Sequence, residues 1–376
     1  MSATLAIVCE RLTGEARVAA TPETVRKWVG QGLKVRIETG AGIRAAFTDS
    51  AYAEAGATVC DTMADTLSAA DLILKVRAPE AAEIAALPTG SRLAAMLDPH
   101  RNKVALSALA ERGIEAYALE FVPRITRAQV MDVLSSQANL AGYRAVIEAA
   151  HGFGRAFPMM MTAAGTVAAA RVFVMGAGVA GLQAVATARR LGAVVTATDV
   201  RPATKEQVES LGAKFVAVED DEFRNAETAG GYAKEMSAEY KAKQAALISA
   251  HIAKQDVVIT TALIPGRAAP VLVTEAQVRS MKPGSVLIDL AVEQGGNVEG
   301  ARVDEVVEID GVKIVGIGNL LSRIAADASS LYAKNLFAFS GLLLKDGVIA
   351  PDLEDEILKA ARVTGDGRIV HPALAG

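Results

Sequence analysis

Two series of short apolar runs, separated by amphipathic segments, dominate the chain. The first series includes TLAIVCE, KVRIET, DLILKV, SRLAAML and IEAYALE, and the second includes ARVFVMG, VVTATDV, KFVAV, DVVITTAL and SVLIDLA. Apolar runs that alternate with helical patterns predict βαβ units and mainly parallel sheets. Thr21 followed by Pro22 marks one helix start, because a Thr N-cap suits a Pro at the first helical position.

Two long helical patterns connect these series. The first runs from Thr126 to Phe157 with apolar residues at helical spacing, and the second lies near Leu321 to Leu344. We therefore predict an α/β protein with two doubly wound parallel-sheet lobes and a cleft between them, where ligands commonly bind. The predicted N-terminal lobe is discontinuous, residues 1–134 plus 319–376, and the second lobe is residues 135–318.

A long polar insertion, residues 219–255, separates KFVAV from DVVITTAL. Ordinary connections have about 4 to 6 residues, so an insertion of this length is usually a functional lid or a disordered segment. The paired glycines Gly230 and Gly231 beside Tyr232 favour a mobile loop that acts as a lid.

The composition is typical of a soluble α/β enzyme. Of 376 residues, 51% are hydrophobic, 22% are charged and 4% are aromatic, which allows a large core. The formal net charge of −4 provides no positive field for nucleic acid. The N-terminus does not resemble a signal peptide, and no apolar run approaches the roughly 20 residues that span a bilayer. Cys9 and Cys60 lack CxxC spacing, as expected in a reducing compartment.

The segment ARVFVMGAGVAGLQAVATARRLGAVVTATDVRP carries the most specific chemistry. It places Gly176, Gly178 and Gly181 between a predicted strand and a predicted helix. In the dinucleotide-binding fingerprint the first glycine permits a tight turn, the second admits a pyrophosphate, and the third allows close packing of helix on strand. The N-terminus of the helix offers N–H groups to the phosphates. This context predicts Rossmann-like lobes and a bound dinucleotide.

Asp199 ends the next predicted strand, at the distance expected of the acid that binds the adenosine ribose. A 2′-phosphate about 4 Å from this carboxylate would be repelled by roughly 4 kcal/mol at a surface-like dielectric. The sequence therefore predicts NAD(H) rather than NADP(H). Arg201 is the counter-evidence, because a nearby arginine can accommodate a 2′-phosphate.

From end to end, the chain resembles the NAD(H)-binding component of the proton-translocating NAD(P) transhydrogenases. The resemblance is carried by PRITRAQVMDVLSSQANLAGYRAV, RAFPMMMTAAGT, ATDVRPATKEQVESLGAKF, ETAGGYAKEM and TTALIPGRAAPVL. It implies a dimeric subunit, cytoplasmic and peripheral on the inner membrane through other subunits. The implied partners are an NADP(H)-binding component (domain III of the beta subunit) and membrane-spanning subunits, with no nucleic acid. Hydride would pass directly from NADH to NADP⁺, coupled to proton translocation by the other chains.

The resemblance also implies roles for individual residues. Arg124, Gln129, Asp132 and Ser135 match nicotinamide-site residues, with Gln129 positioning the ring and the other three fixing its carboxamide. Tyr232 matches a tyrosine in a mobile loop that closes over the nucleotide. The remaining residues expected to bind the cofactor are Val179, Ala180, Val200, Arg201, Ala262 and Leu263. The alternative from spacing alone is that Gln129 and Asp132 lie on a solvated helix face.

Alanine dehydrogenase is the competing interpretation. Arg17 and Lys75 resemble that family's substrate-carboxylate arginine and catalytic lysine, but proton transfer to or from the amine also needs a histidine. The aligned position is Met96, His100 follows four residues later in a predicted loop, and Glu293 replaces an aspartate. These departures favour structural roles for Arg17 and Lys75, with Lys75 paired to an acid.

Other chemistry finds little support in the sequence. His151, His251 and His371 lack metal-ligand spacing, so we predict no metal site. Hydride transfer between nicotinamides needs positioning groups but no general acid or base. A non-enzymatic NAD(H) sensor or binding module remains an alternative.

Overall fold

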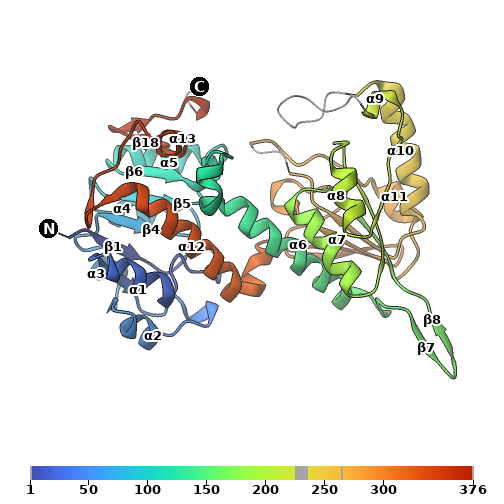
Figure 1. The fold of residues 1–376 in the computed structure, drawn as a ribbon, viewed down its shortest axis with the longest axis horizontal. Helices are drawn as coiled ribbons and strands as arrows, with labels where there is room; N and C mark the ends of the chain where they lie inside the picture. The colour runs from blue at the N-terminus through green and yellow to red at the C-terminus, as the bar shows by residue number, and fades with distance from the viewer. Residues whose placement is uncertain (1, 225–235, 264–265, 375–376) are drawn as a thin grey trace. The chain divides into compact units, whose positions relative to one another are not determined.

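The computed structural model describes residues 2–224, 236–263 and 266–374. The chain divides into two compact units, Met1–Gln137 with Leu321–Gly376 (unit 1) and Ala138–Leu320 (unit 2). The divisions follow Gln137 and Leu320, where the sequence predicted 134 and 318. Unit 1 is therefore discontinuous in sequence, with its last helices contributed by the C-terminal segment (Figure 1).

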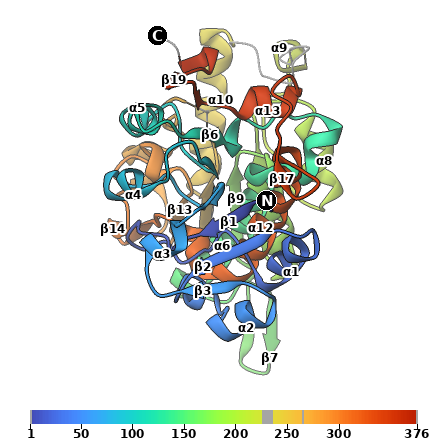
Figure 2. The same ribbon diagram turned by 90° about the vertical axis from the view of Figure 1, so that its left-hand side faces the viewer.

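Unit 1 contains a six-stranded parallel sheet with strand order β3-β2-β1-β4-β5-β6 (Figure 2). This order is that of dinucleotide-binding folds. Its strands are β1 (Thr4–Ile7), β2 (Lys34–Glu38), β3 (Thr58–Cys60), β4 (Leu72–Leu74), β5 (Arg92–Ala95) and β6 (Glu115–Ala118). Its helices are α1 (Pro22–Gly30), α2 (Asp49–Glu54), α3 (Met63–Leu67), α4 (Ala81–Ala86), α5 (Lys103–Glu111), α12 (Ala325–Leu343) and α13 (Glu356–Ala361).

Both faces of this sheet are buried in apolar cores. Leu5 and Ile7 of β1 point into one core, where α12 contributes Tyr332, while Ala6 points into a second core with Leu109 of α5. Successive residues of a strand face opposite sides of the sheet. Burial on both faces explains why the strands are uninterrupted apolar runs rather than alternating patterns.

The predicted start of α1 is confirmed in atomic detail. Thr21 is the N-cap, and its side chain accepts a hydrogen bond from the backbone N–H of Thr24. The Thr24 hydroxyl oxygen in turn accepts from the backbone N–H of Thr21, and Pro22 occupies the first helical position. The two reciprocal bonds satisfy N–H groups that a helix start leaves without partners.

Unit 2 contains a seven-stranded sheet, order β11-β10-β9-β12-β13-β15-β14, in which only β14 is antiparallel to its neighbour among the described strands. The strands are β9 (Arg171–Met175), β10 (Val194–Thr198), β11 (Lys214–Phe215), β12 (Val257–Thr260), β13 (Val286–Asp289), β14 (Glu305–Ile309) and β15 (Val312–Gly316). Its helices include α7 (Val179–Arg190), α8 (Thr204–Ser210), α9 (Asp221–Arg224), α10 (Ala238–Ile252) and α11 (Glu275–Ser280).

Val172 and Phe173 of β9 enter different cores, so this sheet is also covered on both faces. The predicted fold class is confirmed: both units are doubly wound α/β structures. The sequence did not predict β14 and β15, nor the antiparallel hairpin β7 (Met160–Thr162) and β8 (Gly165–Val167). This hairpin extends from the rest of unit 2 as an arm (Figure 1).

Two predicted helices are interrupted at their N-terminal ends. The segment from Thr126 begins as a 3₁₀ helix, η3 (Thr126–Met131), and α6 (Val133–Gly152) follows after a break at Asp132, where ψ is 88°. The segment from Leu321 likewise begins as η5 (Leu320–Ile324) before α12. The long helices predicted in both places are therefore present, and each is preceded by a 3₁₀ segment that the sequence did not predict.

The prediction of a loop over residues 219–255 was also wrong for most of its length. Helices α9 and α10 occupy much of it, and the Ser237 side chain caps α10 by accepting from the backbone N–H of Tyr240. Tyr240, Ile248 and Ile252 are the buried residues of α10, at spacings that place them on one face. Residues 225–235, including Gly230, Gly231 and Tyr232, lie outside the described residues.

Candidate dinucleotide-binding site

The glycine turn between β9 and α7 has the geometry that each glycine predicts. Gly176 has φ of +105°, a conformation that side chains disfavour. A Cβ on Gly181 would lie 1.8 Å from the carbonyl oxygen of Gly176, so no other residue allows this packing. Gly178 has open space where a Cβ would project, and α7 begins directly after it, at Val179, with no side-chain cap in the described structure. The N–H groups of its first turn are therefore available to an anion.

Asp199 follows β10 and reaches back to this turn. Its Oδ2 accepts a 2.7 Å hydrogen bond from the backbone N–H of Ala177. The Arg201 guanidinium pairs with both carboxylate oxygens, with Nε 2.9 Å from Oδ1 and Nη2 3.0 Å from Oδ2. The structure therefore brings Gly176, Asp199 and Arg201 together, as the fingerprint predicts. The Arg201 side chain forms an ion pair with the Asp199 carboxylate.

A pocket of about 680 Å³ opens beside this pair, entirely within unit 2. The carboxyl ends of β9 and β10 and the loop after β12 form one side of it, through residues that include Gly176, Asp199, Val200 and Ala262. This edge is where open α/β sheets bind ligands. Helix α10 forms another wall through Tyr240 and Gln244, which the sequence analysis missed although Tyr240 belongs to a buried stripe with four-residue spacing.

Buried polar groups hold the loop after β12 against this pocket. The Asn297 side chain accepts from the backbone N–H of Ala262 at 3.0 Å and donates to the carbonyl of Ala262 at 2.9 Å. Asp289, at the end of β13, in turn accepts from the backbone N–H of Asn297 at 2.7 Å. Sequence reasoning named Ala262 and Leu263 but missed Asn297, which gives no signal without the fold. Leu263 is 46% exposed.

The predicted nicotinamide residues lie at the junction of η3 and α6, in unit 1. The Asp132 carboxylate accepts from the Ser135 backbone N–H at 2.8 Å and from the Ser135 hydroxyl at 2.6 Å. Arg124 and Gln129 are exposed on the preceding segment. The structure thus joins Asp132 to Ser135, where the carboxylate caps the start of α6.

Asn335 of α12 connects both sides of this junction. Its Nδ2 donates to the carbonyl of Val130 at 2.8 Å, and its Oδ1 accepts from the Ser136 hydroxyl at 2.7 Å. Val130 belongs to η3 and Ser136 to α6, so one side chain sets the angle between the two elements. No pattern in the sequence indicates this role for Asn335.

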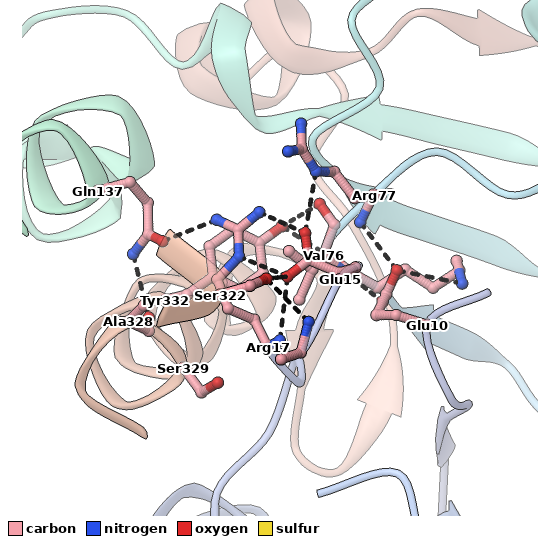
Figure 3. Close-up of polar contacts among 12 residues, drawn as sticks. Glu10, Glu15, Arg17, Val76, Arg77, Gln137, Ser322, Ala328, Ser329 and Tyr332 are labelled. Carbon is pink, nitrogen blue, oxygen red and sulfur yellow. Dashed lines mark hydrogen bonds and ion pairs between the residues drawn. The ribbon is translucent and has the colours of Figure 1, made fainter. Parts of the chain in front are cut away.

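Arg17 and Lys75 are buried in unit 1 among carboxylates of the same chain. Arg17 donates from Nε and Nη2 to the two oxygens of Glu15, at 2.8 and 2.6 Å, and from Nη1 to Gln137 at 2.9 Å (Figure 3). The Lys75 ammonium lies 2.7 Å from Glu83 and 3.4 Å from Glu10. The predicted pairing of Lys75 with an acid is confirmed.

These contacts shift the pKa values of Glu15 and Lys75 in opposite directions. Burial raises the pKa of Glu15, but the hydrogen bonds and charge of Arg17, with that of Arg77, outweigh it and lower the pKa to about 2. Burial lowers the pKa of Lys75, but Glu10 and Glu83 raise it above its ordinary value. Lys75 therefore stays protonated, which prevents it from accepting a proton as a general base.

His100 and Glu293 also belong to the competing interpretation. His100 packs edge-on against Phe121, with ring centroids 5.4 Å apart. Glu293 is exposed on η4 (Val292–Gln294). Among the described residues, no group of three or more histidine, cysteine, aspartate or glutamate side chains could hold a metal ion. No helix in the described part of the chain has the length and apolar character needed to cross a bilayer.

The fold and the glycine turn define a dinucleotide-binding protein with two Rossmann-like units. Residues 6–141 match the family described as alanine dehydrogenase/PNT, N-terminal domain, and residues 145–372 match its C-terminal domain. The chain is 56% identical to a Rhodospirillum rubrum protein, the first portion of NAD(P) transhydrogenase subunit alpha, over 99% of both proteins. It therefore belongs to the alanine dehydrogenase/PNT family, among the NAD(P) transhydrogenase alpha subunits.

Solved structures agree with this assignment. The transhydrogenase from Sinorhizobium meliloti is 56% identical, with a TM-score of 0.90 over 98% of this chain and 100% of that chain. An L-alanine dehydrogenase is 27% identical, with a TM-score of 0.84 over 99% of this chain and 98% of that chain. The resemblance to transhydrogenase stated from the sequence is confirmed, and the two families share one fold.

Proposed function

We propose that this chain is the NAD(H)-binding component of a proton-translocating transhydrogenase. The observation that carries the proposal is the unit 2 pocket, which combines an open glycine turn with the Asp199 carboxylate. Hydride leaves C4 of the dihydronicotinamide of NADH, which becomes NAD⁺, and adds to C4 of NADP⁺, which becomes NADPH. The second dinucleotide is held by a partner component, and other chains couple the reaction to proton translocation.

The roles proposed for Arg124, Gln129, Asp132 and Ser135 rest on the family and on their chemistry. An amide, a hydroxyl and a guanidinium can orient a nicotinamide without exchanging protons with it. The ordered pair of Asp132 and Ser135 supports this role, because a fixed carboxylate holds the hydroxyl in one direction. Tyr232 and Leu263 remain proposed nucleotide contacts.

The alternative, an alanine dehydrogenase, is disfavoured by the charges in unit 1. The carboxylate of an oxo-acid substrate would need to bind the Arg17 guanidinium. The Nε and Nη2 of this guanidinium already donate to Glu15, and its Nη1 donates to Gln137. Oxidation of alanine would need a base that takes a proton from the amine, but Lys75 is held as an ammonium between two carboxylates. Nothing in hydride transfer between nicotinamides requires either group.

We also propose that the chain acts as a homodimer, attached to the membrane at its cytoplasmic face through partner subunits. The arm formed by β7 and β8 supports the dimer, because it exposes Met160, Met161 and Val167, with Met161 78% exposed. Methionine-rich exposed surfaces of this kind favour protein contacts.

The test combines the purified chain with NADH and an NADP⁺-loaded preparation of the partner component, and measures the rate of NADPH formation. A parallel reaction supplies alanine and NAD⁺ without the partner. Rapid hydride transfer that requires the partner supports the proposal. Turnover of alanine by the chain alone would replace it with the dehydrogenase.

A further inference from the structure

The chain passes between unit 1 and unit 2 twice, and both connections lie beside one buried ion pair of unit 1. The first connection follows Gln137 on α6, and the second precedes Leu321 in η5. The ion pair joins Arg17 to Glu15 in the loop between β1 and α1, and the two side chains are 1% and 0% exposed. The same pair can therefore act on both connections.

Arg17 holds the first connection. Its Nη1 donates to Oε1 of Gln137 at 2.9 Å, and Nε2 of Gln137 donates to the carbonyl of Ala328 in α12 at 3.1 Å (Figure 3). The Nε and Nη2 of Arg17 are bonded to Glu15 at 2.8 and 2.6 Å, so the guanidinium cannot turn away from Gln137 without breaking these bonds. The residue of α6 that precedes the connection is therefore bonded to two other parts of unit 1.

Glu15 and its neighbours hold the second connection. Oε1 of Glu15 accepts from the Ser322 hydroxyl at 3.1 Å, and the Ser322 oxygen accepts from the backbone N–H of Ala16 at 2.9 Å. Further along the same segment, the Ser329 oxygen accepts from the backbone N–H of Val18 at 3.0 Å. The loop that carries the ion pair thus binds the returning segment at two points, one in η5 and one in α12.

We propose that Arg17 and Glu15 are positioning residues for hydride transfer, which fix the directions in which both connecting segments leave unit 1. This inference rests on the proposed function. Under that function one dinucleotide depends on both units, because Asp132 and Ser135 belong to unit 1 and the glycine turn belongs to unit 2. The reacting carbons must approach within roughly 3 to 3.5 Å, and a misplacement of about 1 Å can cost about a hundredfold in rate.

Directional bonds distinguish this ion pair from apolar packing in the same place. A buried ion pair is weak evidence for stability, since apolar residues of similar volume often replace it without loss. Paired charge-assisted hydrogen bonds between a guanidinium and a carboxylate nevertheless fix both a distance and an angle. The links that run from this pair to the connecting segments should therefore affect geometry more than stability.

The test cuts each link separately and keeps the ion pair. The variants are Gln137→Met for the first connection and Ser322→Ala for the second. Gln137→Glu is the conservative variant, because its carboxylate can still accept from Arg17. Ser340→Ala is the matched control, since it removes another serine hydroxyl of the C-terminal segment, one that accepts from Trp28 at 2.9 Å. Thermal unfolding identifies the folded variants.

Three quantities are measured for each variant. They are the rate of NADPH formation with the NADP⁺-loaded partner component, the affinity for NADH by calorimetry, and the distribution of distances between two spin labels. The labels are attached through Val104→Cys in α5 of unit 1 and Val306→Cys in β14 of unit 2, positions that are 86% and 61% exposed. Cys9 and Cys60 are replaced by alanine in the labelled chains.

We expect Gln137→Met and Ser322→Ala to lower the rate of hydride transfer at least about tenfold and to broaden the distance distribution. The affinity for NADH should change less than the rate, because the glycine turn and Asp199 lie within unit 2. Gln137→Glu should restore part of the rate. Ser340→Ala should leave the rate and the distribution unchanged.

A folded Gln137→Met or Ser322→Ala variant that keeps the wild-type rate or the wild-type distribution would overturn the inference. An equal loss in Ser340→Ala, or a loss of NADH affinity in parallel with the rate, would do the same, because the effect would then be a general one on the fold. These outcomes leave the proposed function standing. A wild-type chain that transfers no hydride with the partner component would overturn the proposed function, and the inference with it.

Discussion

Replacing Lys75 by methionine removes the cation of a buried network and leaves its carboxylates in place. The ammonium is 1% exposed and lies 2.7 Å from Glu83 and 3.4 Å from Glu10. Removing one partner of a buried ion pair costs about 3 to 5 kcal/mol, because the other charge is left without compensation. Domains have a free energy of unfolding of about 5 to 15 kcal/mol, so this single change should remove a large part of the stability of unit 1.

The single tryptophan makes this loss measurable for unit 1 alone. Trp28 is fully buried in the core of that unit, and its Nε1 donates to the Ser340 hydroxyl at 2.9 Å. Tryptophan fluorescence during urea unfolding therefore reports unit 1, which avoids treating a two-unit chain as one transition. The matched control is Lys27→Met, which removes an exposed pair with Glu23 at 2.8 Å and should cost less than about 0.5 kcal/mol.

The pH dependence supplies a second, independent check. Burial raises the pKa of Glu10, opposed by the charge of Lys75, so loss of Lys75 should raise that pKa further. A carboxyl group whose pKa is higher in the folded state than in the unfolded state binds a proton more tightly in the folded state. Its contribution to the free energy of unfolding therefore falls as pH rises. The deficit of Lys75→Met relative to wild type should therefore shrink as pH is lowered from about 8 to about 6, and Glu10→Gln should recover part of it. A deficit no larger than that of Lys27→Met would refute the reasoning.

The other predictions concern the pocket and its supports. Gly142→Ala should strongly destabilise unit 2 and weaken NADH binding, since the added Cβ would lie 2.0 Å from the carbonyl oxygen of Ala180. Gly341→Ala, in open space on α12, should instead stabilise the helix by up to about 1 kcal/mol. Equal shifts of the thermal unfolding temperature in the two variants would contradict this. Asn335→Ala should lower the rate of hydride transfer more than the affinity for NADH. Asn335→Asp keeps only the oxygen that accepts from Ser136, and it should restore part of the rate. Equal rates in the two variants would mean that neither hydrogen bond of Asn335 positions the site. Burial, followed by the charges of nearby lysines and an arginine, lowers the pKa of His251. The folded state therefore binds the proton less well than the unfolded state, and the free energy of unfolding should fall as pH drops below about 6.5. Thermal unfolding should show a smaller fall with pH in His251→Gln. Gln129→Asn should slow hydride transfer far more than it weakens NADH binding; a parallel loss in both would remove its role in ring position.

What could be predicted from the sequence depended on how local each signal was. The Gly176 turn and Asp199 lie within one βαβ unit, so spacing alone placed them correctly. The apolar runs identified the strands because both faces of each sheet are buried. Helix α10 was missed because its buried residues are only Tyr240, Ile248 and Ile252, and this sparse stripe shows only with the sheet in place.

Support residues could not be predicted for a different reason. Asn297 and Asn335 each bond backbone groups far away in sequence, 35 residues for Asn297 with Ala262 and 205 for Asn335 with Val130. A lone asparagine gives no pattern, and its role exists only when the fold brings a donor and an acceptor to it. The break at Asp132 is similar, because helical periodicity continues through it while the backbone does not.

The two units show that the same sheet edge can form an open pocket or a structural network, depending on which side chains fill it. Strand order reverses beside β1 and β4 in unit 1 and beside β9 and β12 in unit 2, and ligands bind at such a point in open α/β sheets. In unit 2 this edge carries glycines and a pocket of about 680 Å³. In unit 1 the residues after β1 and β4 include Glu10 and Lys75, which are buried and paired with each other. Because Arg17 and Lys75 there already have carboxylates of the same chain as partners, an anionic substrate would have to displace a buried ion pair. This supports the proposal that the dinucleotide binds in unit 2.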